Sequence, residues 1–260
     1  MTAAEAATVA AATSCPVCAG ASTALGSVDF SKNCEERRGL RLPPSGRAIE
    51  YRICIACGHA FAPAFRGWTP ADFRREIYNE QYTLVDPDWT GARARENAQF
   101  LIGVFGERGP AASHLDYGGG DGSLSRLLRE AGWRSASHDP FVDAGAGPEE
   151  PGGYGFISCF EVFEHVADPH ALMRDLAARL APQGLLMAST LLSDGELAPG
   201  RAPDWWYAAP RNGHISLFSS RSLRALAQRQ GFNCASAQGL LHLFWRGALP
   251  AWARPLVGQA

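Results

Sequence analysis

The chain has 260 residues, a formal net charge of −2 and 46% hydrophobic residues, which is enough apolar material for one average-to-large domain with a small appendage. Because the charges nearly balance, the composition argues against a nucleic-acid-binding protein, and no apolar run is long enough to cross a bilayer. Residues 1–13 are rich in Ala and Thr and lack the basic start of a secretory signal. We therefore expect a disordered tail over 1–13 and a cytoplasmic location.

Four of the seven cysteines form two C-x-x-C pairs. Two such pairs, each followed by a turn, are typical of a structural zinc ribbon in which four thiolates close a tetrahedral Zn²⁺ site. A disulfide interpretation is disfavoured for a cytoplasmic chain, and a redox motif would need only one pair. Cys34 and His59 are spare candidate ligands. We predict a zinc module over 14–67 with the ligands Cys15, Cys18, Cys54 and Cys57.

The stretch HLDYGGGDGSLSRLLREAG, residues 114–132, predicts a strand, a glycine loop and an amphipathic helix. Glycines let a ligand approach the backbone, and the helix N-terminus favours an anionic group. The dinucleotide pattern G-x-G-x-x-G fails because Ser123 and Ser125 stand where its last glycine should be. The residues fit D-x-G-x-G-x-G instead, with Asp116 as the acid.

With this loop the chain resembles the class I methyltransferases, which use S-adenosylmethionine (SAM). The resemblance implies that the loop packs on the methionine part of SAM and that the acid ending the next strand, Asp139, contacts the ribose; a turn residue before Pro140 is the alternative. Tyr82 resembles an aromatic residue of the cofactor lid, with ordinary helix packing as its alternative. The residues predicted to bind SAM are Tyr82, Asp116, Gly118, Gly119, Gly120, Gly122, Asp139, Phe160 and Glu161.

Residues 156–192 predict a strand, a loop, a helix from Pro169 and a buried strand, similar to the fourth and fifth strands of that family. The expected fold is α/β, with a Rossmann-like seven-stranded sheet in a methyltransferase domain over 68–260 that begins with lid helices. Only 14 residues separate Asp139 from Tyr154, so the third strand and its helix look truncated or missing.

The sulfonium of SAM is already electrophilic, so the protein has to position the acceptor and, for a hydroxyl or an acidic carbon, provide a base. His165, His214 and Tyr207 are the candidate catalytic residues. For His165 the alternative is that it only orders its loop, and for Tyr207 that it belongs to a hydrophobic flap.

The sequence predicts a methyltransferase for a small-molecule acceptor. Zinc knuckles before such a core also resemble the sugar C-methyltransferases, which favours a sugar or natural-product intermediate. The alternatives are an rRNA methyltransferase and a non-catalytic docking module on a degenerate fold. The zinc module could shape the substrate side of the site or make a homodimer contact.

Overall fold

The computed structural model describes residues 14–89, 91–106, 109, 111–142, 147–237 and 239–257, so the predicted tail over 1–13 lies outside the described residues. The contacts divide the chain into two compact units. Unit 1 comprises the described parts of Met1–Asp86, Glu164–His170 and Leu191–Leu226. Unit 2 comprises those of Pro87–Phe163, Ala171–Thr190 and Ala227–Ala260.

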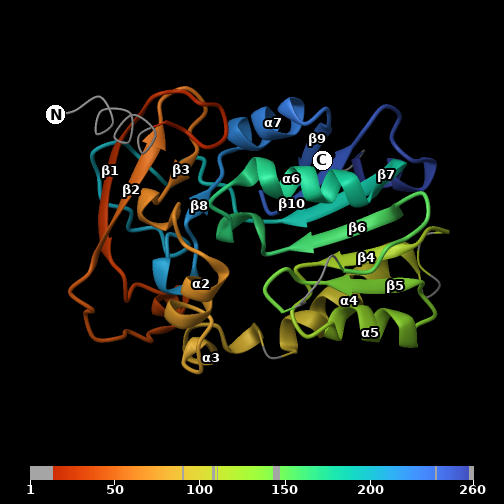
Figure 1. Ribbon diagram of the computed structural model, residues 1–260, viewed down its shortest axis with the longest axis horizontal. Coiled ribbons are helices and arrows are strands. Elements are labelled where there is room, and N and C mark those ends of the chain that lie inside the picture. Colours follow the sequence, from red (N-terminus) through yellow and green to blue (C-terminus); the bar gives the residue numbers. More distant parts are fainter. Residues whose placement is uncertain are drawn as a thin grey trace. The chain divides into compact units, whose positions relative to one another are not determined.

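Unit 2 contains a six-stranded sheet in the order β5-β4-β6-β7-β10-β9 (Figure 1). The first four strands are parallel, and β10 runs antiparallel to both β7 and β9. The strands are β4 His114–Tyr117, β5 Ser135–His138, β6 Tyr154–Phe160, β7 Leu180–Ser189, β9 Asn233–Ala237 and β10 Leu241–Trp245.

The sheet confirms the α/β, Rossmann-like fold class. Among the described residues it has one strand fewer than the seven expected, and none is described between β5 and β6, where the chain was predicted to be truncated. The described residues of that interval form turns and irregular backbone.

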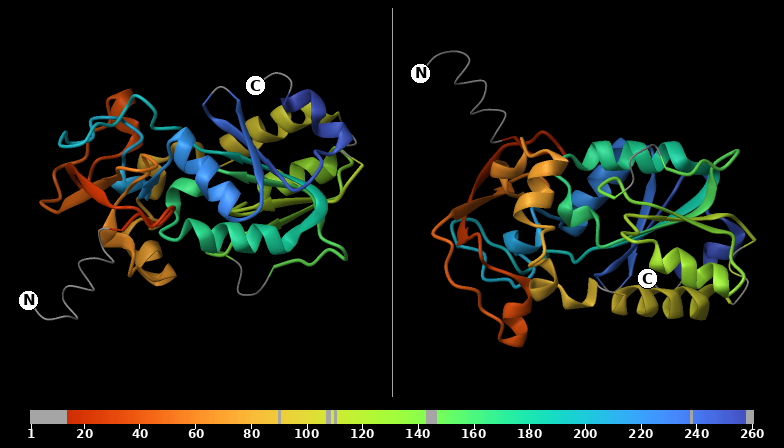
Figure 2. Two further views of the ribbon diagram at one scale, coloured as in Figure 1. Left: turned by 90° about the horizontal axis from the view of Figure 1, so that it is seen from above. Right: turned by 60° about the horizontal axis from the view of Figure 1, so that its bottom comes forward.

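Helices cover both faces of this sheet. Figures 1 and 2 show α4 and α5 on one face and α6 on the other. Leu101 of α4 and Leu128 of α5 are fully buried against Phe156 of β6 and Met187 of β7, and each such side chain contributes about 1.5–3 kcal/mol of apolar burial. The described α-helices that follow residue 86 are α4 Ala92–Phe105, α5 Ser123–Glu130, α6 Pro169–Arg179, α7 Ser220–Arg229 and α8 Arg254–Val257.

Unit 1 contains a four-stranded antiparallel sheet in the order β1-β2-β3-β8. Its last strand comes from a part of the sequence more than 150 residues after β3, so the sheet joins the cysteine-bearing segment to the segment after β7. A bulge at Gly26 has φ +146°, and a Cβ there would overlap the backbone of Ala202. The strands are β1 Ser22–Asp29, β2 Ala48–Cys54, β3 Ala60–Phe61 and β8 Ser216–Leu217.

Two short helices, α2 Pro70–Glu76 and α3 Tyr82–Val85, complete unit 1. Thr69 caps α2: its hydroxyl accepts from the N–H of Asp72, and the Asp72 carboxylate accepts from the backbone N–H of Thr69. No described helix of the chain is both long and apolar enough to span a membrane.

Candidate functional site

The four predicted zinc ligands lie together in unit 1. Their sulfur atoms are all within 4.8 Å of one another, with 3.6 Å between Cys15 and Cys57 and 3.4 Å between Cys18 and Cys54. All seven cysteines are free thiols. Four sulfurs bound tetrahedrally at about 2.3 Å from one metal ion would be about 3.8 Å apart, so the observed spacing suits such a site with small adjustments.

Backbone N–H groups of the knuckle turns point at these sulfurs. Val17 donates to Cys15 at 3.4 Å, Gly20 to Cys18 at 3.4 Å, and Cys57 to Cys54 at 3.5 Å. Such donors stabilise thiolates and orient them as ligands. The hydrogen bond with the Cys57 thiol also lowers the pKa of Cys15 to about 5. Cys34 and His59, the spare candidates, are not part of this cluster.

The glycine loop in unit 2 combines positive φ angles with two positions that have no space for a side chain. Gly118, Gly120 and Gly122 have positive φ angles of 76°, 55° and 73°. A Cβ at Gly118 would overlap the Val162 side chain, and a Cβ at Gly119 would overlap both the Ser137 hydroxyl and the Asp116 carboxylate. Gly122 is the N-cap residue of α5, so the loop runs directly into a helix N-terminus. This arrangement can hold an anionic group.

Asp116 is a buried carboxylate that lies beneath the loop. Ser158 donates to its Oδ1 at 3.1 Å, whereas its Oδ2 has no hydrogen-bond partner. Burial, helped by the nearby carboxylates of Asp139 and Asp121, raises the pKa of Asp116 to about 7, against the opposing hydrogen bond from Ser158. An unsatisfied buried oxygen at this place suits a ligand that can donate a hydrogen bond.

A buried polar chain supports Asp116 from behind, and sequence reasoning missed it. His114 is fully buried, and burial lowers its pKa to about 3, so its ring is neutral. Its Nε2 lies 3.0 Å from Ser158 Oγ and its Nδ1 lies 2.8 Å from Ser135 Oγ. Because Ser158 donates to Asp116, the imidazole Nε2–H must donate to Ser158 when the carboxylate is ionised. His114 thus fixes the orientation of the group that holds Asp116.

Asp139 and Glu161 lie at the ends of neighbouring elements of unit 2. Asp139 Oδ2 accepts from the backbone N–H of Gly120 at 2.9 Å, which ties this acid to the loop. Glu161 has a left-handed φ of 53°, and the hydroxyl of Ser189 donates to its Oε1 at 2.8 Å. A strained backbone that is held in place by hydrogen bonds is typical of functional sites. Phe160 packs partly against the core.

Eight of the nine predicted SAM-binding residues therefore belong to unit 2. Tyr82 belongs to unit 1, where it is buried and its hydroxyl donates to Asp86 at 3.1 Å. Its predicted contact with a cofactor stays a prediction.

The three candidate catalytic residues lie together in unit 1 with Glu164. We call Glu164, His165, Tyr207 and His214 the histidine group. The hydroxyl of Tyr207 donates to Glu164 Oε1 at 2.5 Å, and the ring centroids of the two histidines are 5.0 Å apart. Glu164, Tyr207 and His214 are buried, whereas His165 is half-buried.

The hydrogen bonds of the two histidines determine which ring nitrogen carries the proton. His165 Nδ1 lies 3.2 Å from the carbonyl oxygen of Gly213, and His214 Nδ1 lies 2.8 Å from that of Tyr207. Since a carbonyl oxygen only accepts, both Nδ1 atoms carry hydrogen, and in each neutral ring the lone pair is on Nε2. A carboxylate oxygen of Glu164 and one ring nitrogen each of His165 and His214 lie within 4.8 Å of one another. Because a neutral imidazole can take up a proton at Nε2, the group can act as a base.

The segment before β2 also contacts the histidine group, although nothing local in the sequence indicates it. Cys34 Sγ lies 3.7 Å from His214 Nδ1, and burial raises the pKa of this thiol. Lys32 Nζ donates to the carbonyl oxygens of Trp205 and Ala208 at 2.6 and 2.9 Å. Trp205 is buried, in keeping with a hydrophobic flap.

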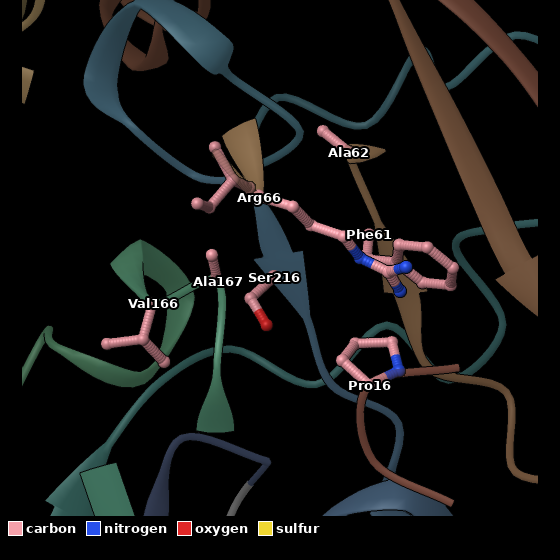
Figure 3. Close-up of a pocket in the computed structure, with 8 residues that line it drawn as sticks. Pro16, Phe61, Ala62, Arg66, Val166, Ala167 and Ser216 are labelled. Atoms are coloured by element: carbon pink, nitrogen blue, oxygen red, sulfur yellow. The ribbon is translucent and has the colours of Figure 1, made fainter. Parts of the chain in front are cut away.

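A small cavity lies beside the first knuckle in unit 1, with Pro16 of that knuckle in its lining (Figure 3). Arg66 reaches over the Phe61 ring at 4.8 Å from its centroid. His59 is buried next to it, with Nε2 3.2 Å from Ser216 Oγ, and burial lowers its pKa to about 3. His59 is therefore a neutral residue of the core, and it lies outside the cluster of four cysteines. The cavity is lined by Pro16, Phe61, Ala62, Arg66, Val166, Ala167, Ile215 and Ser216.

Comparison with known proteins shows which family and which relatives the chain is similar to. A protein-family model described as a methyltransferase domain matches residues 89–237, which is more than half of the chain. The ubiquinone biosynthesis O-methyltransferase of Sodalis glossinidius is 34% identical over 92 residues, covering 35% of this chain and 36% of the relative. That of Caulobacter sp. strain K31 is 40% identical over 62 residues, covering 24% and 23%. The similarity thus spans about a third or less of these relatives' length.

Two solved structures are similar at lower identity. The 1,6-didemethyltoxoflavin-N1-methyltransferase of Burkholderia thailandensis is 17% identical, with a TM-score of 0.47 and coverage of 73% of this chain and 95% of that one. The magnesium protoporphyrin IX methyltransferase of Synechocystis PCC 6803, solved with bound S-adenosylhomocysteine, is 18% identical, with a TM-score of 0.41 and coverage of 71% and 97%.

The buried carboxyl of Asp116 generates a prediction about stability. Its pKa is raised to about 7, whereas an unfolded aspartate titrates near about 3.9. Between these values the folded chain keeps a proton that the unfolded chain has lost, so this contribution to stability is complete below about pH 4 and is lost as the pH rises through about 7. Relative to the Asp116→Asn variant, the wild type should lose on the order of 4 kcal/mol over that range.

Urea unfolding of both proteins between pH 4 and 8 measures this difference. Circular dichroism of the folded variant at each pH serves as the control for an altered fold. A free-energy difference between the two proteins that does not vary with pH would contradict the prediction.

Proposed function

The chain belongs to the methyltransferase-domain family, and from this premise we propose that it transfers a methyl group from SAM to a small-molecule acceptor. The observation that carries the proposal is the glycine loop that leads into α5 above the unsatisfied Oδ2 of Asp116. SAM has a carboxylate, an ammonium group and two ribose hydroxyls. The loop and helix N-terminus suit the first, Asp116 the second, and Asp139 the third.

The carboxylate of Asp139 only accepts hydrogen bonds, so it suits the ribose hydroxyls of SAM as donors. Its Oδ2 accepts from the backbone N–H of Gly120 and its Oδ1 from that of Phe141, and both contacts hold the carboxylate at the loop. When bound, SAM supplies a methyl group that is already electrophilic, so the protein has to hold the partners in line and exclude water.

We assign the acid–base role to the histidine group. In the neutral rings of His165 and His214, Nε2 is the atom that takes up a proton, and the carboxylate of Glu164, held by Tyr207, stabilises an imidazolium that forms beside it. A base of this kind suits an acceptor with a dissociable proton. The curated relatives are named ubiquinone biosynthesis O-methyltransferases, which favours a hydroxyl group on a small molecule as the acceptor.

We further propose that the four cysteines hold a structural Zn²⁺. The spacing of the sulfurs and the N–H donors that face them support this assignment. Four protein ligands leave no open position on the metal, so its role is structural.

Calorimetric titration with SAM and with S-adenosylhomocysteine tests the cofactor site. We expect both to bind, and Asp139→Asn to weaken SAM about 10- to 100-fold, because hydrogen bonds to a charged group contribute about 1.5–3 kcal/mol. Glu130→Gln, an exposed substitution on α5 of the same unit, is the matched control and should leave the affinity unchanged. If the folded wild type binds neither compound, the proposal is wrong, and a docking module becomes the better account.

The histidine group is tested by turnover. With an acceptor that the wild type methylates, chosen from a panel of dihydroxybenzoates and nucleotide-linked sugars, His165→Asn and His214→Asn should slow product formation about 10²- to 10⁴-fold. Their affinity for SAM should stay the same, since that site belongs to unit 2. If a variant that carries both His165→Asn and His214→Asn forms product at the wild-type rate, the histidine group does not provide the base.

The metal site is tested by elemental analysis. We expect about one zinc per chain in the wild type and much less in Cys54→Ser, because losing one thiolate opens the closed site. Cys234→Ser, which changes a thiol in β9 outside the cluster, is the control and should retain zinc. Equal zinc contents in the two variants would contradict the assignment.

A further inference from the structure

Both cysteine knuckles are hydrogen-bonded to the segments that carry the histidine group. The carbonyl oxygen of Val17, in the first knuckle, accepts from His170 Nε2 at 2.8 Å. The carbonyl oxygen of Cys57, in the second knuckle, accepts from the hydroxyl of Ser219 at 2.6 Å. His170 ends the segment that begins with Glu164, and Ser219 follows β8. Each knuckle therefore holds one side of the group.

A backbone ladder continues from the second knuckle to Glu164 itself. Strand β3 pairs with β8, and next to this pair the N–H of Ala62 donates to the carbonyl oxygen of Ile215 at 2.9 Å. The N–H of Ile215 in turn donates to the carbonyl oxygen of Glu164 at 2.8 Å. Glu164 is thus only two backbone hydrogen bonds from the strand that follows the knuckle.

The strand that leads into the second knuckle supports His214 directly. Tyr51 of β2 is fully buried, and its hydroxyl donates to the carbonyl oxygen of His214 at 2.6 Å. Tyr51 is three residues before Cys54, so the position of the knuckle and that of His214 are linked through one short strand.

The knuckles themselves depend on their sulfurs. Their turns are closed by backbone hydrogen bonds such as Ala19 to Cys15 and Gly58 to Cys54, both at 2.9 Å. In a small segment of this kind the free energy of metal binding is free energy of folding. Loss of the metal would leave only the weak thiol contacts of 3.4–3.6 Å between the two knuckles, and the knuckles should open.

The glycine loop has its own supports. Gly118 donates its N–H to the carbonyl oxygen of His138 at 2.8 Å, and Gly120 donates to Asp139 at 2.9 Å. All of these residues belong to unit 2. The hydrogen-bonded side chains behind the loop, which run from Asp116 through Ser158 and His114 to Ser135, belong to it too.

We propose that the metal at the four cysteines controls the order of the histidine group while leaving the cofactor loop unchanged. Loaded protein presents the acceptor-side residues in the geometry described above; stripped protein retains the glycine loop but loses that geometry. The proposal rests on the proposed zinc site and does not require that the chain transfers methyl groups.

Hydrogen exchange, followed by mass spectrometry on the full chain, tests this. The protein is compared as purified, after removal of zinc with a chelator, and after addition of zinc. On removal, exchange in residues 164–170 and 205–219 should rise by at least about tenfold, since locally opened regions lose protection without global unfolding. Residues 114–128 and 185–189 should stay protected, and affinity for S-adenosylhomocysteine should change by less than about threefold. Addition of zinc should restore protection.

Three results would overturn the proposal. Unchanged exchange in 205–219 after zinc removal would show that the histidine group does not depend on the metal. Loss of protection throughout both units would show that the metal stabilises the whole chain without distinction. If the purified protein contains no zinc yet 205–219 is fully protected, both this inference and the zinc assignment are wrong.

Variants that retain all four cysteines separate the contacts from the metal. Ser219→Ala removes the hydrogen bond to Cys57, and Tyr51→Phe removes the hydrogen bond to His214. Both should keep about one zinc per chain and raise exchange in 205–219. Ser45→Ala removes a hydrogen bond to Asp29 in the same unit, at an exposed position, and is the matched control. Equal exchange in all three variants would contradict the proposal.

Discussion

The pairing of β3 with β8 is the constraint on which unit 1 depends. These strands have only two residues each, yet they join segments that lie more than 150 residues apart in the sequence. Once Ala60 faces Leu217 and Phe61 faces Ser216, Ile215 is placed to donate to Glu164, and residues 213 and 214 are fixed beside it. A slip of one residue would turn every side chain of β8 to the opposite face of the sheet. The register of this short ladder therefore determines the geometry of the histidine group.

The site in unit 2 depends mainly on residues that are close together in the sequence. Its glycine loop needs positive φ angles and close approaches that favour glycine, and the glycines concerned lie within five consecutive positions. The long-range element is the buried chain that runs from Asp116 through Ser158 and His114 to Ser135. These hydrogen bonds link the three adjacent parallel strands β5, β4 and β6. The carboxylate of Asp116 is therefore held in place by the sheet rather than by the glycine loop.

The contrast explains what could be predicted from sequence. The glycine loop, the two C-x-x-C pairs and the short interval after Asp139 are local patterns, and the fold class follows from them together with the order of strands and helices. His165, Tyr207 and His214 were named from local motifs, but their meeting depends on the β3–β8 pairing. The contacts of Cys34, Lys32 and Tyr51 with residues 205–214 have no local signal, because they arise from tertiary packing between distant segments. His59, chosen for its proximity to Cys57, instead packs between Phe61 and Phe218.

The buried acid of unit 2 shows why such a site is retained. A carboxyl whose pKa is raised to about 7 by burial, with one oxygen unsatisfied, destabilises the folded chain near neutral pH. Asparagine of similar shape would avoid the charge, so packing alone does not account for aspartate here. A bound ligand that donates to Oδ2 would offset the cost of desolvation and bring the pKa down again. The free-energy cost of burying Asp116 without a ligand is then recovered when a ligand binds. This is expected where a polar group is held in position for a partner before the partner binds.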